Sequence, residues 1–154
     1  MRRADPVFAE LVDAARAARE NAYAPYSGLK VGAAVRAGGR VFAGCNVENA
    51  SYPVGICAER GALCAAVAAG CHEIEAVVVV SARPIAPCGM CRQALAELAS
   101  GRASATGRSG ARGRSGGQDG RPCPVLLVGD DAERLTDLDE LLPLPFTSRD
   151  VDCG

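Results

Sequence analysis

The chain has 154 residues, 49% of them hydrophobic, which is typical of one domain that buries roughly two-thirds of its unfolded surface. Its 17 basic and 18 acidic residues leave a formal charge of −1, which argues against a nucleic-acid or membrane partner. No apolar run approaches the ~20 residues that cross a bilayer, and the first residues lack the apolar stretch of a secretory signal. We therefore expect a soluble, cytoplasmic protein with residues 1–154 in a single domain.

The first part of the chain predicts a helix followed by a hairpin. Asp5 and Pro6 form a helix start, since a capping carboxylate precedes proline at the first helical position. An apolar stripe at helical spacing then continues to about Asn21. Lys30–Ala37 and Arg40–Cys45 are strand-like, and the two glycines between them allow the positive φ angles of a tight hairpin.

The rest of the chain alternates helices with apolar strands. Alanine-rich Ala58–Ala69 predicts a helix closed by a glycine, and Met90–Leu98 carries apolar residues at helical spacing. Apolar runs at Ile74–Val80 and Val125–Val128 predict strands covered on both faces. A last short helix is expected over Thr136–Leu142, capped by its first residue. This order implies right-handed crossovers, so we expect an α/β fold: a three-layer α/β/α sandwich with a mixed, mostly parallel central sheet.

Residues 100–122 differ from the rest in composition. They are rich in glycine, serine and arginine, with hardly an apolar side chain larger than alanine. Such a segment cannot bury enough surface to offset the entropy of ordering it. A basic arm that binds phosphates is the alternative interpretation, but the composition favours a flexible insertion within the domain. We expect its deletion to leave activity and assembly intact.

Eight cysteines are many for such a chain, and in a reducing compartment metal binding or catalysis explains them better than disulfides. Cys57 precedes one predicted helix, while Cys88 and Cys91 begin the next. Free amide hydrogens and the helix dipole at such positions favour the thiolates that a metal needs. Cys64 is about two turns, or ~10 Å, along the first helix and too far away to share a tetrahedral ion. It is expected to be a small core residue, as are Cys45 and Cys123.

The predicted metal site lacks a fourth protein ligand, since the single histidine, His72, lies beyond the far end of the first helix. Zinc with three protein ligands and one open position is the catalytic arrangement, because the open position holds a water of lowered pKa. Glu59 lies beside Cys57 and could shuttle protons, although alone it would be an acidic residue favoured by the helix dipole. Arg60 could offset the charge of a third thiolate, or could be a surface cation.

Several segments resemble the cytidine deaminases, a family in which an x-Glu follows the first zinc ligand and a Pro-Cys-x-x-Cys comes later. The resemblance covers about residues 21–99 and 123–150. The matching segments outside the cysteine motifs are Tyr23-Ala24-Pro25-Tyr26-Ser27, Val31-Gly32-Ala33-Ala34, Gly44-Cys45-Asn46-Val47-Glu48-Asn49-Ala50-Ser51-Tyr52, Leu141-Leu142-Pro143 and Phe146. The chain is most similar to the small homotetrameric three-cysteine members of the cytidine/deoxycytidylate deaminase superfamily.

The resemblance implies a zinc-dependent hydrolase of pyrimidine salvage, which converts cytidine and deoxycytidine to uridine and deoxyuridine. Cys57, Cys88 and Cys91 would hold one Zn²⁺ per subunit. Glu59 would pass a proton from the activated water to the ring and then to the departing ammonia. Water would attack carbon 4 of the pyrimidine.

The resemblance also implies the substrate contacts. Asn46 and Glu48 would bind a sugar hydroxyl, the Ala58 amide would contact the pyrimidine carbonyl, and Arg60 would lie behind the ligands. Tyr52 and Leu29 would line the substrate site, and Phe146 would cover the base from a neighbouring subunit of a homotetramer with shared active sites. Leu29 stands where relatives usually have a phenylalanine, which implies weaker affinity for the base.

Three alternatives stay open. A deaminase of a modified cytosine nucleoside, like the blasticidin-type enzymes, is the nearest, although Asn46, Glu48 and Phe146 favour ordinary nucleosides. A nucleic-acid editing deaminase would need a basic groove and stacking aromatics, and the chain has three tyrosines, three phenylalanines and no net positive charge. A structural zinc module would need a fourth ligand and would not use Glu59.

Overall fold

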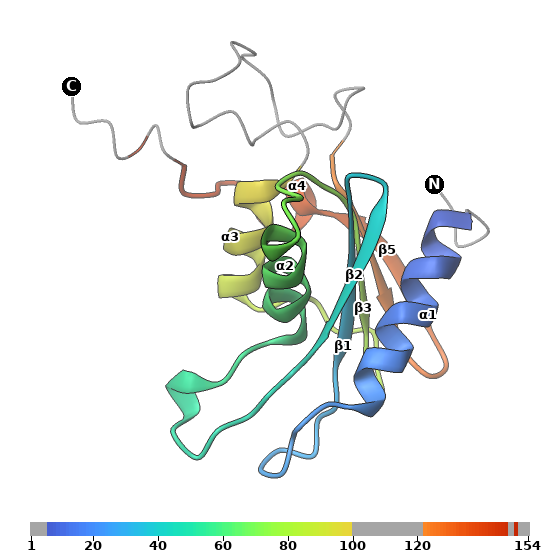
Figure 1. Ribbon diagram of the computed structural model, residues 1–154, viewed down its shortest axis with the longest axis vertical. Coiled ribbons are helices and arrows are strands. Elements are labelled where there is room, and N and C mark those ends of the chain that lie inside the picture. The colour runs from blue at the N-terminus through green and yellow to red at the C-terminus, as the bar shows by residue number, and fades with distance from the viewer. Residues whose placement is uncertain (1–5, 100–121, 148–149, 151–154) are drawn as a thin grey trace.

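A five-stranded sheet in the order β2-β1-β3-β4-β5 has α1 on one face and α2 and α3 on the other, as Figure 1 shows. The computed structural model describes residues 6–99, 122–147 and 150, and the predicted insertion lies outside this part of the chain except for Pro122. The elements are α1 (Pro6–Glu20), β1 (Gly32–Ala37), β2 (Arg40–Cys45), the 3-10 helix η1 (Tyr52–Val54), α2 (Ala58–Ala68), β3 (Ile74–Val80), α3 (Gly89–Leu98), β4 (Pro124–Val128), β5 (Glu133–Asp137) and α4 (Leu138–Leu141). No helix in these ranges is long and apolar enough to cross a membrane.

The two faces of the sheet bury two separate apolar clusters. Helix α1 buries Phe8, Leu11, Val12 and Ala15 against one face, at the spacing that gives an apolar stripe. The opposite face packs alternate residues of the same strands against α2 and α3, where Leu95 is fully buried. The three-layer α/β/α prediction is therefore confirmed, and so are the strands covered on both faces.

The strand directions differ from the prediction of a mostly parallel sheet. Only β3 and β4 pair in parallel, while β1 pairs antiparallel with both β2 and β3, and β4 pairs antiparallel with β5. The sheet is mixed as expected, but the prediction that parallel pairs dominate is wrong. The crossover through α2 makes β3 run in the direction of β2. Because its neighbour is β1, the other arm of the hairpin, the pair is antiparallel.

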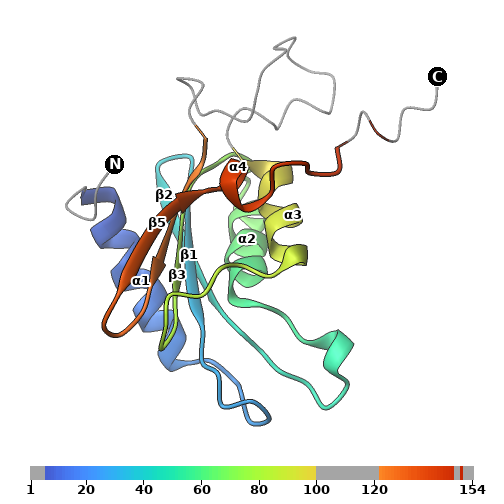
Figure 2. The same cartoon turned by 180° about the vertical axis from the view of Figure 1, so that it is seen from behind.

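The last strand and helix also differ from the prediction. Thr136 lies inside the edge strand β5, and the cap of α4 is Asp137, whose Oδ1 accepts from the backbone N–H of Glu140 at 2.8 Å. The Thr136 hydroxyl instead donates to the Glu140 carboxylate. The strand escaped prediction because its sequence, Glu-Arg-Leu-Thr-Asp, has no run of apolar residues. Figure 2 shows α4 beside α3.

Two motif glycines set how closely the helices approach the sheet. A Cβ at Gly44 would lie 2.4 Å from the backbone nitrogen of Ala62, and one at Gly32 would lie 1.9 Å from the carbonyl oxygen of Ala15. Only glycine permits such contact between backbones. Helix α2 therefore lies directly on β2, which fixes the position of the helix start that carries Cys57.

Candidate metal centre and substrate cavity

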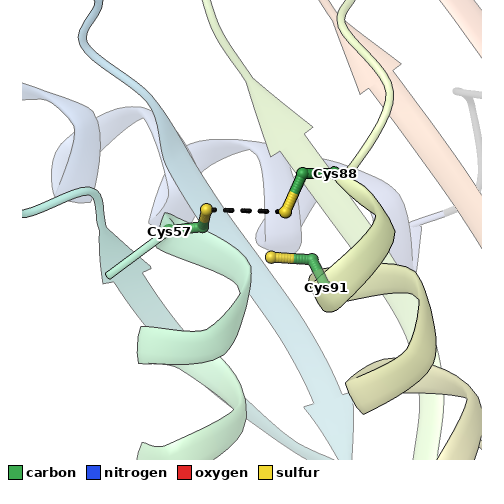
Figure 3. A group of neighbouring side chains, drawn as sticks. All are labelled: Cys57, Cys88 and Cys91. Atoms are coloured by element: carbon green, nitrogen blue, oxygen red, sulfur yellow. Dashed lines mark hydrogen bonds between the residues drawn. The ribbon is translucent and has the colours of Figure 1, made fainter. Parts of the chain in front are cut away.

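Three cysteine sulfurs converge at the N-terminal ends of α2 and α3, as Figure 3 shows. Cys57 is the N-cap of α2, Cys88 is the N-cap of α3, and Cys91 lies in the first turn of α3. The three sulfurs all lie within 4.8 Å of one another, with 3.7 Å between those of Cys57 and Cys88. Two sulfurs bound to one tetrahedral zinc ion, each at about 2.3 Å, lie about 3.8 Å apart. The cluster therefore has the size of a zinc site.

The electrostatics of the cluster favour a bound cation. Burial and the negative groups nearby raise the pKa of the Cys57 and Cys91 thiols. Burial also acts to raise the pKa of Cys88, but hydrogen bonds from the Cys91 backbone and from both neighbouring thiols leave it lowered. Three thiolates beside a buried carboxylate need a compensating charge, and a set of soft sulfur donors suits zinc.

Glu59 and Arg60 follow directly in the first turn of α2. Glu59 is only 5% exposed, and burial raises the pKa of its carboxyl group, with Cys91 and Arg60 opposing the shift. Burial acts to lower the pKa of Arg60, but the charges of Cys57 and Cys91 raise it by more. Its Nη2 donates to the Gly55 carbonyl at 3.2 Å, while its buried Nε has no hydrogen-bond partner among the described residues. A carboxyl group with a raised pKa takes up a proton more readily than an exposed one, which suits a group that carries protons.

A cavity of about 590 Å³ opens onto the cluster, a volume suited to a small molecule. Most of the residues singled out in the sequence lie on its wall: Leu29, Asn46, Glu48, Tyr52, Cys57, Ala58, Glu59, Arg60 and Cys88. Cys91 is fully buried at the cluster. Phe146 is not on the wall and is 62% exposed on the C-terminal segment.

The polar wall of the cavity is tied to the turn before β1. Asn46 accepts from the Val31 amide with Oδ1 and donates to the Leu29 carbonyl with Nδ2, both at 2.8 Å. Glu48 accepts hydrogen bonds from Tyr26 and Ser27. These side chains therefore shape the loop as well as face the cavity.

Arg92 and Gln93, which follow Cys91 in α3, hold the C-terminal segment by hydrogen bonds. Neither was predicted as a site residue. Arg92 donates to the Pro87 carbonyl at 2.7 Å and to the Leu141 carbonyl at 2.9 Å. The Gln93 amide accepts from the Phe146 backbone N–H at 3.0 Å and donates to the Phe146 carbonyl at 2.8 Å. No pattern in the sequence indicates the pairs with Leu141 and Phe146, because these partners lie 49 and 53 residues away along the chain.

Ser27, Ile85 and Met90 also line the cavity and were not predicted to do so. Ser27 belongs to the segment Tyr23-Ala24-Pro25-Tyr26-Ser27, whose resemblance to the family was the one feature of the sequence that could have indicated it.

Among the remaining cysteines, Cys123 is buried as expected and Cys45 is partly buried. Cys64 is exposed, so its prediction as a core residue is wrong: it lies on the outer face of α2.

Comparisons with known proteins agree with this arrangement. A crystal structure of cytidine deaminase from Burkholderia pseudomallei is 44% identical, with a TM-score of 0.71 over 90% of this chain and 98% of that one. One from Mycobacterium tuberculosis is 32% identical, with a TM-score of 0.65 over 92% and 98%. The cytidine deaminase of Sporosarcina psychrophila is 44% identical over 95 residues, which is 60% of this chain and 70% of that protein. That of Halalkalibacterium halodurans is 50% identical over 91 residues, or 57% and 69%.

The family model for the cytidine and deoxycytidylate deaminase zinc-binding region matches residues 8–105. This span contains the three clustered cysteines and the buried glutamate, and it includes more than half of the chain. Sequence, fold and the grouping of the thiols thus lead to the same result: the chain belongs to the cytidine and deoxycytidylate deaminase family.

Proposed function

We propose that this protein deaminates cytidine and deoxycytidine hydrolytically to uridine and deoxyuridine, as a step of pyrimidine salvage, with one zinc ion per subunit. The observation that carries the proposal is that three cysteine sulfurs lie within 4.8 Å of one another, and that two of them, Cys57 and Cys88, line one cavity together with the buried Glu59. The group contains no fourth ligand from the described part of the chain, which suits a catalytic rather than a structural zinc site. Relatives named cytidine deaminase at 44% and 50% identity support the choice of substrate.

The chain's own residues supply the proton transfers. Cys57, Cys88 and Cys91 would hold the zinc ion, which when bound polarises a water molecule and lowers its pKa toward neutrality. Glu59 would accept one proton from the attacking water as the water oxygen bonds to carbon 4, and would give that proton to the neighbouring ring nitrogen. It would then move the remaining proton of the new hydroxyl group to the amino group, so that the carbon–nitrogen bond breaks, ammonia leaves and the carbonyl group of uridine forms. Burial raises the pKa of the Glu59 carboxyl group, which makes it easier to protonate than an exposed glutamate, as a proton carrier requires.

The remaining wall residues bind and orient the nucleoside. Ala58 is the first residue of α2, so its backbone N–H has no partner within the helix and can donate to the pyrimidine carbonyl. Asn46 and Glu48 bind a sugar hydroxyl, and Leu29 and Tyr52 provide apolar surface beside the base. Arg60 offsets the negative charge of the thiolates.

We further propose a homotetramer in which Phe146 reaches the cavity of a neighbouring subunit. Large apolar side chains that are exposed in a single chain favour burial in an assembly, and Tyr52, Leu144 and Phe146 are 75%, 92% and 62% exposed. Light scattering of the purified protein gives the mass directly. A monomer at working concentration would refute this assembly.

The decisive experiment is to follow the loss of cytidine absorbance with zinc-loaded protein, a chelator-stripped sample and Glu59→Gln. We expect conversion only with zinc and a loss of at least about a thousandfold in kcat for Glu59→Gln, with its zinc content unchanged. Glu97→Gln, an exposed glutamate of α3, is the matched control and should remain active. Full activity of Glu59→Gln would overturn its role. A zinc-loaded wild type that converts neither cytidine nor deoxycytidine would overturn the substrate in favour of a modified cytosine nucleoside.

A further inference from the structure

One serine hydroxyl links the turn before β1 to the carboxylate on the cavity wall. Ser27 Oγ accepts a hydrogen bond from the Leu29 backbone N–H at 3.0 Å. The amide can only donate, so the hydroxyl proton of Ser27 points at Glu48 Oε1, with which it forms a hydrogen bond. The Ser27 hydroxyl therefore holds two cavity-lining residues at once, Glu48 through its side chain and Leu29 through its backbone.

The second oxygen of Glu48 is held by the same turn. Its Oε2 accepts from the backbone N–H groups of Tyr26 at 2.8 Å and Ser27 at 3.2 Å. The hydrogen bond from the Ser27 hydroxyl is the main cause that lowers the pKa of Glu48, with smaller contributions from the two amides and an opposing effect of burial. Glu48 is therefore ionised at neutral pH and serves as a hydrogen-bond acceptor.

Counting hydrogen-bond positions shows what this wall can still bind. A carboxylate offers about four acceptor positions, and Glu48 uses three of them, which leaves one on Oε1. Asn46 has used one amide hydrogen on Leu29 and one oxygen lone pair on Val31, so one donor and one acceptor position remain. A single hydroxyl group satisfies both residues by donating to Glu48 and accepting from Asn46.

We infer that Ser27 is a positioning residue for substrate recognition: its hydroxyl fixes Glu48 and Leu29 where they receive one sugar hydroxyl and the pyrimidine ring. This inference rests on the proposed function and adds a specificity determinant to it. Without the hydroxyl, Oε1 of Glu48 loses a fixed partner, its side chain gains rotamers, and water competes for the position. Ser27 lies at the surface, where water can replace its hydrogen bonds, so its loss should affect substrate binding and leave folding intact.

The test compares Ser27→Ala, Ser27→Thr and the control Ser51→Ala on cytidine and on cytidine analogues that each lack one sugar hydroxyl. Ser51 is exposed, does not line the cavity and does not cap η1 with its side chain. We expect Ser27→Ala to lower kcat/KM for cytidine roughly tenfold, mainly through KM, and to have less than about a third of that effect on the analogue without the recognised hydroxyl. Threonine should restore most of the loss, while Ser51→Ala, zinc content and the melting temperature should not change.

An active wild type whose Ser27→Ala variant loses the same factor on every analogue, or loses nothing, would overturn the inference alone. Failure of threonine to restore activity would do the same. A wild type that deaminates none of these nucleosides would overturn the proposed function and the inference together.

Discussion

Gly44 is the position where a single added methyl group should disturb both the fold and the metal centre. In Gly44→Ala the new Cβ would lie 2.4 Å from the Ala62 nitrogen, and 2.7 Å from both the Ala58 oxygen and the Gly61 carbonyl carbon. All three are backbone atoms of α2, so no side chain can rotate away and the helix must retreat by about 1 Å to reach ordinary contact. Overpacking of this kind costs about 1–3 kcal/mol. At about 2–4 °C per kcal/mol for a chain of this size, the melting temperature should fall by roughly 2–12 °C.

Gly61 provides a matched control on the other side of the same contact. A Cβ at Gly61 would have its nearest atoms at 3.6 Å, which is ordinary van der Waals contact. Glycine in a helix interior is about 1 kcal/mol less favourable than alanine, so Gly61→Ala should raise the melting temperature by about 2–4 °C. The two variants add the same methyl group to the same interface and should shift stability in opposite directions.

The assay is thermal unfolding of the zinc-loaded proteins, combined with zinc retention against a chelator of known affinity. Helix α2 begins immediately after Cys57, so a displacement of the helix moves one sulfur away from the other two. We expect Gly44→Ala to lose zinc at a lower chelator concentration than the wild type, whereas Gly61→Ala should not. Gly44→Ala with an unchanged melting temperature and zinc affinity would refute the close-packing argument.

Three further variants test the cluster, the cavity and the C-terminal segment. Cys91→Ala should reduce bound zinc to less than about a tenth of the wild-type content by metal analysis, while the exposed cysteine variant Cys64→Ala keeps it; retention in Cys91→Ala would place the metal elsewhere. Leu29→Phe should lower KM for cytidine roughly two- to tenfold because an aromatic ring stacks on the base, and an unchanged or higher KM would contradict this. Gln93→Leu should speed hydrogen exchange at the Phe146 amide roughly two- to tenfold with zinc content unchanged, whereas unchanged exchange would show that the amide contributes little.

The fold was predictable where burial leaves a periodic signal in the sequence. The helix stripe of α1 and the apolar runs of β3 and β4 satisfy this condition, and the hairpin glycines Gly38 and Gly39 have the expected positive φ angles of 56° and 71°. The edge strand β5 does not satisfy it, because most of its side chains are not buried. The relative directions of the strands could not be predicted from local sequence either, because they depend on which strand of the hairpin, β1 or β2, pairs with β3.

The cysteine cluster was predictable because each of its members is tied to a local feature, a helix start, that the sequence marks. The spacing of Cys57, Cys88 and Cys91 in the sequence indicates metal binding over most other functions. Only the structure shows that their sulfurs lie close together. The positioning contacts are different in kind. Ser27 holds Glu48, and Gln93 holds Phe146, across 21 and 53 residues of sequence, with ordinary polar side chains that have many possible partners.

This difference has a consequence for where specificity can change within such a fold. A ligand cysteine cannot vary without loss of the metal, whereas a hydroxyl or amide that orients a neighbour can be replaced at the cost of one or two hydrogen bonds, about 1 kcal/mol each. The turn that carries Ser27 and Leu29 lines the cavity and is hydrogen-bonded to Asn46 and Glu48, and it contains none of the three clustered cysteines. Substitutions in this turn can therefore alter which nucleoside fits while the sulfur cluster and Glu59 stay in place. Leu29, which lines the cavity from this turn, is the position at which we expect such a change to act first.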